Sequence, residues 1–314
     1  MSRAPLRVGT RASLLARTQS GLVADRLSAG NGRQTQLVEI STRGDVDRAP
    51  LAEIGGTGVF TSALRDALLD GRVDVAVHSL KDLPTAPAEG VVLAAVPSRE
   101  DPRDVLVARD GLTLGELPVG STIGTGSPRR AAQLRALGLG LEVVDIRGNV
   151  DTRLGRVRDG SLDAVVLARA GLARFGRLDE VSEVLDPLQM LPAPGQGALG
   201  IECRAGDPVV ESIRTTLDDA PTRVAVTAER AFLAAVEAGC TAPVGALADL
   251  VSVEPDVDEL WLRAVMADVS GTPLLRRSTT GSALRPDQVG QSLAASMLDE
   301  GADTLLLNAR GAEP

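Results

Sequence analysis

The feature that most constrains the fold is an alternation of strand-like and helix-like segments that occurs twice along the chain. In the first stretch, helix-like segments separate the strand-like segments 6–9, 37–41 and 73–78. In the second stretch, the strand-like segments are 122–125, 142–146 and 164–167. Such alternation is typical of a parallel sheet flanked by helices, so the sequence predicts two α/β lobes.

Two local similarities relate the stretches: RVGTRAS resembles TIGTGSPRR, and LLDGRVDVAV resembles VRDGSLDAVV. The segments SREDPRD and LPAPGQGA flank the second stretch and predict paired crossovers between the lobes. Two connecting strands form a hinge, and a ligand is then expected in the cleft between the lobes. The expected boundaries are 1–97 with 198–216 for domain 1, 103–191 for domain 2, and 98–102 with 192–197 for the hinge.

The last third of the chain, 220–314, predicts a smaller α+β domain. A long helix is expected at 222–238, followed by two strands and a helix at about 287–300. The predicted fold class is therefore α/β with three domains: two α/β lobes joined by a two-strand hinge, and a smaller α+β C-terminal domain.

Charge balance and cysteine content exclude several classes of protein. The chain has 42 acidic against 33 basic residues and a net charge of −9, which disfavours nucleic-acid and anionic-membrane partners. The apolar run 91–96 is too short to cross a bilayer, and the arginine-rich N-terminus does not resemble a signal peptide. Two cysteines without CxxC spacing and one histidine cannot form a usual zinc site. We therefore expect a cytoplasmic protein without a metal ion.

The segment VAVHSLKDLP carries the only lysine of the chain, Lys81, and the only histidine, His78, together with Ser79 and Asp82. Open α/β sheets bind ligands at the carboxyl ends of their strands, where this segment is expected. A lone ammonium in a chain that otherwise uses arginine predicts a function for Lys81, and the Asp82 carboxylate could stabilise a developing cation. The alternatives are an Asx turn at Asp82 and a satisfied strand-end histidine.

Positive charge is concentrated at 125–180, where 10 arginines stand against 7 acidic residues. In GTGSPRR, Ser127 can cap the following helix and leave backbone N–H groups beside Thr125, Arg129 and Arg130. The first lobe has the same layout in GTRASLLA. Both patterns predict anion sites, and the alternative is a capped surface helix with solvated arginines.

More arginines follow at Arg147, Arg153 and Arg174. Guanidinium forks bind carboxylates and phosphates alike, so the pattern alone does not separate these ligand classes. The sequence has no GxxxxGK[ST] motif, and it has only three Phe, one Trp and no Tyr, which disfavours nucleotides and single-stranded nucleic acid. Small polycarboxylates are the ligands that fit these features.

The two cysteines have different settings. Cys240 lies in EAGCTAPVG, on a glycine-flanked loop after a helix, whereas Cys203 lies in the apolar strand GALGIEC. Exposure favours Cys240 as the reactive thiol, and the alternative is a buried, inert thiol.

Taken together, these segments resemble the porphobilinogen deaminase (hydroxymethylbilane synthase) family from near the N-terminus to about residue 310. The motifs that carry the resemblance, in the order of the family, are GTRASLLA, VAVHSLKDLP, REDPRD, GTGSPRR, RGNVDTRL, PAPGQGA, GIECR, TAERAFL and GCTAPVG. The resemblance implies three domains, of which the first two are like periplasmic binding proteins and the third carries a cysteine on a loop.

The resemblance also implies a transferase of porphyrin and heme biosynthesis. Cys240 would hold a dipyrromethane cofactor through a thioether, and Asp82 would stabilise pyrrole N–H groups and cationic intermediates. Each of four porphobilinogen molecules would lose ammonia to give an azafulvene cation that the growing chain attacks, before hydrolysis releases the linear tetrapyrrole hydroxymethylbilane. We expect a monomer whose only partner is this small substrate.

Each pyrrole ring carries an acetate and a propionate, which accounts for the arginines. The residues that match family positions binding these side chains are Arg11, Ser13, Ser79, Lys81, Thr125, Ser127, Arg129, Arg130, Arg147, Arg153 and Arg174. Gln196 and Gly197 match the hinge, and Phe60 follows the mobile loop of the family.

The chain departs from the family pattern at three positions. Glu53 and Thr57 occupy the loop before Phe60, where many members have lysines, so a weaker contribution of this loop is expected. Gly126 stands where a hydroxyl residue is common, which predicts the loss of one hydrogen bond. A non-catalytic two-lobed binding protein for a small anion is the alternative function, and it would need neither Cys240 nor a third domain.

Overall fold

A computed structural model of the chain describes residues 4–41, 59–237, 242–254 and 257–305. The chain divides into two compact units, Met1–Glu100 with Ala198–Arg223, and Asp101–Gly197 with Val224–Pro314. Two of the three boundaries, 100–101 and 197–198, lie in or beside the segments expected to form the hinge. The division into three domains and the hinge itself stay predictions.

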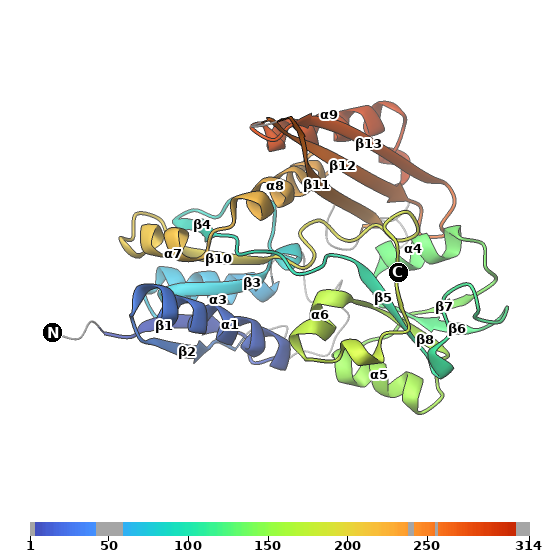
Figure 1. Cartoon of the computed structure of the whole chain (residues 1–314), viewed down its shortest axis with the longest axis horizontal. Coiled ribbons are helices and arrows are strands. Elements are labelled where there is room, and N and C mark those ends of the chain that lie inside the picture. The colour runs from blue at the N-terminus through green and yellow to red at the C-terminus, as the bar shows by residue number, and fades with distance from the viewer. Residues whose placement is uncertain (1–3, 42–58, 238–241, 255–256, 306–314) are drawn as a thin grey trace. The chain divides into compact units, whose positions relative to one another are not determined.

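The first unit contains a five-stranded sheet with the order β2-β1-β3-β10-β4 (Figure 1). Its strands are β1 (Leu6–Thr10), β2 (Thr35–Glu39), β3 (Val75–Ser79), β4 (Val91–Ala95) and β10 (Leu199–Arg204). Its helices are α1 (Leu14–Asn31), α3 (Val59–Leu69) and α7 (Val209–Leu217), and a short 3₁₀ turn, η1 (Leu80–Asp82), follows β3. The strands β1, β2 and β3 are parallel, whereas β10 is antiparallel to β3 and β4.

Apolar side chains cover both faces of this sheet at its centre, and strands such as β3 and β4 are accordingly almost continuously hydrophobic. On one face Val8 and Ile201 pack with Leu27 of α1 and Ile213 of α7. On the other face the core contains Leu64, Leu68, Val73 and Ala76 with further residues of α3 and β3. The polar residues that follow β1 and β3 lie beyond this apolar core, at the carboxyl ends of the two strands.

The second unit contains another five-stranded sheet, with the order β7-β6-β8-β5-β9. Its strands are β5 (Asp104–Ala108), β6 (Thr122–Gly124), β7 (Glu142–Val144), β8 (Ala164–Ala168) and β9 (Glu183–Val184). The helices around it are α4 (Pro128–Ala136), α5 (Val150–Arg158) and α6 (Arg169–Arg174), and the 3₁₀ turns are η2 (Arg109–Gly111) and η3 (Leu178–Glu180).

The prediction of a parallel sheet in each lobe is confirmed for the alternating segments, but each whole sheet is mixed. In each sheet the alternating segments do form parallel neighbours, but β10 in the first unit and β5 in the second run antiparallel to them. Both antiparallel strands lie directly after a crossing of the chain from one unit to the other, so they do not follow the strand–helix–strand connection that makes neighbours parallel.

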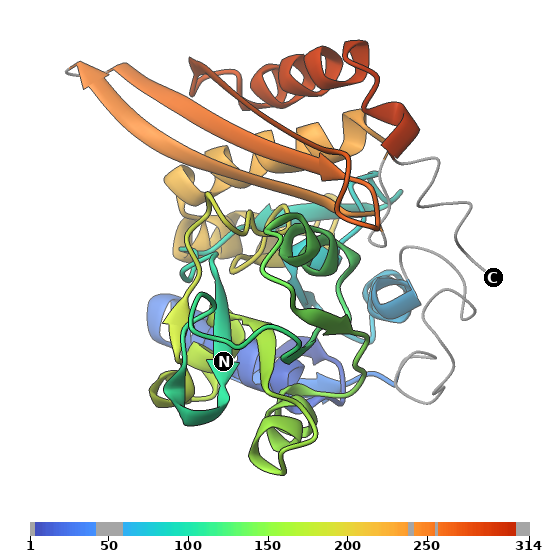
Figure 2. The same cartoon turned by 90° about the vertical axis from the view of Figure 1, so that its right-hand side faces the viewer.

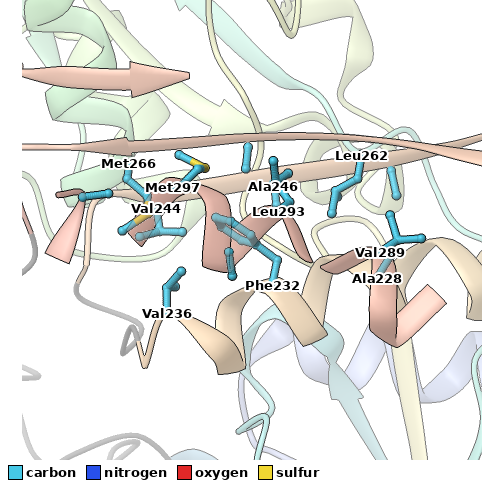
Figure 3. Packing of buried hydrophobic residues seen from close by; sticks show 14 of the residues in the cluster. Ala228, Phe232, Val236, Val244, Ala246, Leu262, Met266, Val289, Leu293 and Met297 are labelled. Atoms are coloured by element: carbon cyan, nitrogen blue, oxygen red, sulfur yellow. The ribbon is translucent and has the colours of Figure 1, made fainter. Parts of the chain in front are cut away.

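The C-terminal part is an antiparallel three-stranded sheet with helices on one face. Its elements are α8 (Ala220–Ala235), β11 (Val244–Glu254), β12 (Val257–Ala267), β13 (Leu274–Ser282) and α9 (Pro286–Asp299). The hairpin of β11 and β12 is the long orange ribbon of Figure 2, and α9 is red. In Figure 3, Phe232 of α8 and Leu293 of α9 point toward Ala246 and Leu262 of the sheet, and all four are buried.

This sheet packs against the lobe that contains α4, within the same unit. The Ala246 amide donates to the Pro192 carbonyl oxygen at 3.0 Å, and Leu191, Leu247 and Val265 form a small apolar cluster. A Cβ atom at Gly245 would lie 2.9 Å from the Leu191 carbonyl oxygen, so only glycine allows this approach without a shift. The predicted class, two α/β lobes with a C-terminal α+β part, is confirmed. No helix among the described residues is long and apolar enough to cross a membrane.

Candidate active site

In the first unit, the predicted site residues lie at one edge of the sheet. Strands β1 and β3 are parallel neighbours, so their carboxyl ends meet there. Arg11 and Ser13 follow β1, while Ser79 ends β3. Lys81 and Asp82 lie in the 3₁₀ turn that follows, with Asp82 exposed to solvent. The fold therefore brings together the residues that the sequence predicted for this lobe.

A side-chain contact fixes the end of β3 to the first helix. Ser79 Oγ lies 3.1 Å from Gln19 Nε2, and Gln19 is buried in α1. Ser13 is the N-cap of α1, where its Oγ accepts a hydrogen bond from the Ala16 amide at 3.3 Å. Ser13 thus caps the helix, which is the alternative that the sequence left open, and its side chain is exposed to solvent.

The only histidine of the chain joins a buried ion cluster under the same strand end. His78 Nε2 lies 3.2 Å from Glu202 Oε2, and Arg65 of α3 donates to Glu202 through Nε at 3.0 Å and Nη2 at 2.8 Å. Burial raises the pKa of Glu202, but the contacts with His78 and Arg65 outweigh it and lower that pKa to about 2. His78 is thus a buried strand-end residue beside Glu202, but the alternative of a fully satisfied histidine is wrong, because its Nε2 makes no hydrogen bond of good geometry among the described residues.

In the second unit, the GTGSPRR motif forms the turn between β6 and α4. Helix α4 begins at Pro128 as predicted, but the predicted side-chain cap by Ser127 is wrong. The Ser127 amide instead donates to Thr125 Oγ1 at 3.2 Å, and Thr125 is buried. A Cβ atom at Gly126 would lie 2.6 Å from the Ile146 carbonyl oxygen, so this glycine permits a close approach of two strand ends rather than merely removing a hydroxyl.

Arg129 and Arg130 are buried around one carboxylate, Asp104, which begins β5. Arg129 Nη2 and Arg130 Nη2 each lie 2.8 Å from an oxygen of Asp104, and Gln196 Nε2 donates to the same carboxylate at 2.8 Å. Gln196 also donates to the Pro102 carbonyl oxygen at 2.7 Å. Burial disfavours the charge of Asp104, yet the two arginines hold the pKa of Asp104 well below its usual range.

Arg147 and Arg153 lie near the same turn, with Asp145 as their acidic neighbour. Arg147 Nε pairs with Asp145 at 3.1 Å on the surface, and Arg153 Nε donates to the Gly148 carbonyl oxygen at 2.9 Å. Burial lowers the pKa of Arg153, and the charges of Arg130 and Arg147 lower it further. Three guanidinium groups thus repel one another here, which favours the binding of an anion.

Arg174 ends α6 and contacts the second chain crossing. Its Nη2 donates to the Gly197 carbonyl oxygen at 2.7 Å. Gly197 has a φ of 87°, a backbone conformation that glycine adopts without strain. Arg174 and Gln196 therefore both attach the 196–197 segment to the second unit.

Sequence comparisons identify the family. Residues 6–212 match the family described as porphobilinogen deaminase, dipyromethane cofactor binding domain, and residues 224–299 match its C-terminal domain. The chain belongs to the porphobilinogen deaminase family. It is 58% identical to the porphobilinogen deaminase of Nocardia farcinica, over 99% of this chain and 90% of that protein. The porphobilinogen deaminase of Mycobacterium tuberculosis is also 58% identical, over 97% of this chain and 99% of that protein.

Among solved structures, an ABC-transporter periplasmic substrate-binding protein from Coxiella burnetii has a TM-score of 0.44. It is 14% identical to this porphobilinogen deaminase family member, over 72% of this chain and 96% of that chain. An ancestral arginine-binding protein has a TM-score of 0.37 at 18% identity, over 69% of this chain and 92% of that chain. Similarity this distant says nothing about a ligand.

Several residues predicted from the porphobilinogen deaminase pattern lie outside the described part of the structure. These are Cys240, Glu53, Thr57 and the side chain of Phe60. The other cysteine, Cys203, is fully buried in β10, and burial raises the pKa of its thiol to about 12. A thiol of that kind is protonated and unreactive at neutral pH, which makes Cys203 unsuitable as the anchor of a covalent cofactor.

Three residues that position the site were not predicted as site residues: Gln19, Asp104 and Glu202. Asp104 and Glu202 each stand in an otherwise apolar strand, DVLVA and LGIECR. An acidic residue in a buried strand needs cationic partners, and this signal could have found both. Gln19 gives no such signal, because a polar residue in a helix is usually exposed.

Proposed function

We propose that this chain polymerises four porphobilinogen molecules, with loss of ammonia, into hydroxymethylbilane. A dipyrromethane bound through a thioether to Cys240 would prime the reaction. Membership in the porphobilinogen deaminase family, with matches to both family domains, supports this function.

The observation that carries the proposal is the arginine cluster beside the turn between β6 and α4. Arg153 is half-buried, and the charges of Arg130 and Arg147 repel its charge, while the charge of Asp145 attracts it. A dipyrromethane or a growing oligopyrrole carries two carboxylates per ring. Such an anion would pair with the guanidinium groups of Arg147 and Arg153 through bidentate hydrogen bonds, whereas Arg130 is already bonded to Asp104.

The residues present fit the implied cofactor. Arg147, Arg153 and the first-turn backbone N–H groups of α4 would hold its carboxylates, because all of these groups are hydrogen-bond donors that suit an anion. When bound, the dipyrromethane supplies the pyrrole carbon to which the first substrate unit is joined.

Two groups of this chain act in other ways. Arg129 and Arg130 are fixed by Asp104. We assign them the role of maintaining a positive electrostatic potential at the first turn of α4. The Asp82 carboxylate is exposed at the end of β3, where it would stabilise positive charge on a pyrrole ring that loses ammonia. Arg11, Ser79 and Lys81 lie with Asp82 at the carboxyl ends of β1 and β3 in the first unit, and they would bind substrate carboxylates.

The test is the stoichiometry of the reaction. Incubation of the purified chain with porphobilinogen should release four ammonia molecules for each tetrapyrrole. Arg153→Gln should raise KM for porphobilinogen at least about tenfold, because one charge-assisted bidentate contact is lost. Arg156→Gln, an exposed arginine on the same helix, is the matched control and should leave KM unchanged.

Binding of porphobilinogen without release of ammonia would contradict the proposal and indicate the two-lobed binding protein instead. We further propose that the chain acts as a monomer in the cytoplasm. A reducing compartment keeps Cys240 available as a thiol for the cofactor.

A further inference from the structure

A half-buried arginine of the C-terminal sheet, Arg276 in β13, reaches into the neighbouring lobe of the same unit. Its Nη2 donates to Gln133 Oε1 at 2.8 Å and to the Gln189 carbonyl oxygen at 3.1 Å. Its Nη1 donates to the Pro187 carbonyl oxygen at 3.2 Å. Burial lowers the pKa of Arg276, because a buried charge loses contact with water. The three oxygen acceptors compensate by accepting hydrogen bonds from the charged guanidinium group.

Gln133, buried in α4, connects this arginine to the segment before the second chain crossing. Its Oε1 also accepts from the Leu191 amide at 2.9 Å, and its Nε2 donates to the Leu191 carbonyl oxygen at 3.0 Å. The amide orientation is therefore set, because Oε1 has two donors.

The same Leu191 carbonyl oxygen accepts a hydrogen bond from Arg129 Nη1. Arg129 in turn binds Asp104, which also holds Arg130 and Gln196. A continuous buried chain of polar contacts thus runs from β13 through α4 to the arginines at its first turn.

The surrounding backbone leaves little room for this chain of contacts to shift. A Cβ atom at Gly271, in the turn between β12 and β13, would lie 2.7 Å from the Ala132 carbonyl oxygen of α4. Close packing of this kind transmits a displacement instead of absorbing it.

We propose that Arg276 and Gln133 are positioning residues, which set the place of the Arg129 and Arg130 guanidinium groups from the C-terminal sheet. The relevance to catalysis rests on the proposed function, in which these arginines maintain the potential of the anion site.

The test compares two adjacent arginines of one strand. Arg276→Met removes the contact to Gln133, whereas Arg277→Met is the matched control, since Arg277 is exposed and pairs with Glu300. Hydrogen exchange followed by mass spectrometry reports on backbone opening at 101–108, 127–134 and 191–197. We expect Arg276→Met to speed exchange about tenfold in all three segments, although the hydrogen bonds described for Arg276 go to Gln133, Pro187 and Gln189 and not to 101–108. Arg277→Met should leave the three segments unchanged.

Steady-state kinetics gives a second measurement. We expect Arg276→Met and Gln133→Met to lower kcat about tenfold, because misplaced charges act on the reacting centre, with KM within about threefold of wild type. Arg276→Lys should recover part of kcat, since the ammonium still donates to Gln133.

Faster exchange confined to β13, or equal effects of Arg276→Met and Arg277→Met, would overturn the proposal. If Arg276→Met does not fold, Arg276→Lys and Gln133→Glu decide it by the same exchange measurement. A wild-type chain without activity would refute the proposed function. The exchange experiment would still decide whether Arg276 and Gln133 position Arg129 and Arg130.

Discussion

At the residue scale, the buried charges of the site are held by several partners each. Glu202 has Arg65 and His78, and Asp104 has two arginines and an amide. Removing one member of such a set leaves an uncompensated buried charge, which is costly to stability. These clusters therefore determine how the lobes respond to pH and to substitution.

The pH dependence of Glu202 follows from its lowered pKa. With a pKa of about 2 in the folded chain against an ordinary value of 4.5, Glu202 contributes about 3 kcal/mol of stability above pH 4.5, which is lost as the pH falls toward 2. Glu202→Gln should therefore lower the free energy of unfolding by about 3 kcal/mol at pH 7, measured by urea denaturation.

The difference between wild type and Glu202→Gln should stay constant above about pH 5 and shrink below it. A difference that does not change between pH 7 and pH 3 would show that Glu202 is not stabilised as a carboxylate.

Asp82 is exposed, so its replacement tests catalysis without testing folding. Asp82→Asn should lower kcat about 100-fold or more, because one preorganised charge beside the reacting ring is lost, while the unfolding midpoint stays unchanged. Asp66→Asn, an exposed residue of α3 in the same unit, is the control. Turnover close to wild type in Asp82→Asn would remove Asp82 from its proposed role.

At the element scale, the two helix starts that looked alike in sequence differ. Ser13 caps α1 through its side chain, whereas Ser127 makes no such bond at the start of α4. At the start of α4 the hydrogen bond is made instead by the Ser127 amide, which donates to Thr125 Oγ1. Sequence predicted where both helices begin, but not how the side chains at those positions are oriented.

The cap and the binding role of Ser13 can be separated by charge. Ser13→Ala should cost about 1 kcal/mol of stability, because the Ala16 amide loses its acceptor. Ser13→Asp retains a good cap and should stay within about 0.5 kcal/mol of wild type, but like-charge repulsion should raise KM about tenfold. Equal KM values in Ser13→Asp and wild type would show that Ser13 only caps the helix.

The turn at Gly126 tolerates no side chain. Gly126→Ser, which restores the hydroxyl residue common in the family, should destabilise the chain by about 1–3 kcal/mol, since Cβ would press on the Ile146 carbonyl oxygen. Gly115→Ser is the control, because a Cβ atom there meets nothing within 4 Å. A more stable Gly126→Ser chain, measured by thermal unfolding, would contradict the packing described for this turn.

At the scale of the whole molecule, local pattern predicted much of the fold. The alternating segments became parallel strands at the expected places because their hydrophobic spacing is local information. Strand β5 was not predicted as a strand, and its place in the sheet depends on β8 and β9, which lie far along the chain. The same holds for the candidate site. Its residues at strand ends were predicted from motifs, whereas the pairing of Asp104 with Arg129 depends on long-range packing.

The central claim is that Cys240 carries a two-pyrrole cofactor, and intact-mass spectrometry of the purified native chain tests it most directly. Cys240→Ser should lack the adduct, whereas Cys203→Ala should retain it, because Cys203 is buried and its thiol stays protonated. The expected result is a wild-type mass increased by one dipyrromethane. A wild-type chain with the mass of the bare polypeptide, both as purified and after incubation with porphobilinogen, would contradict the claim.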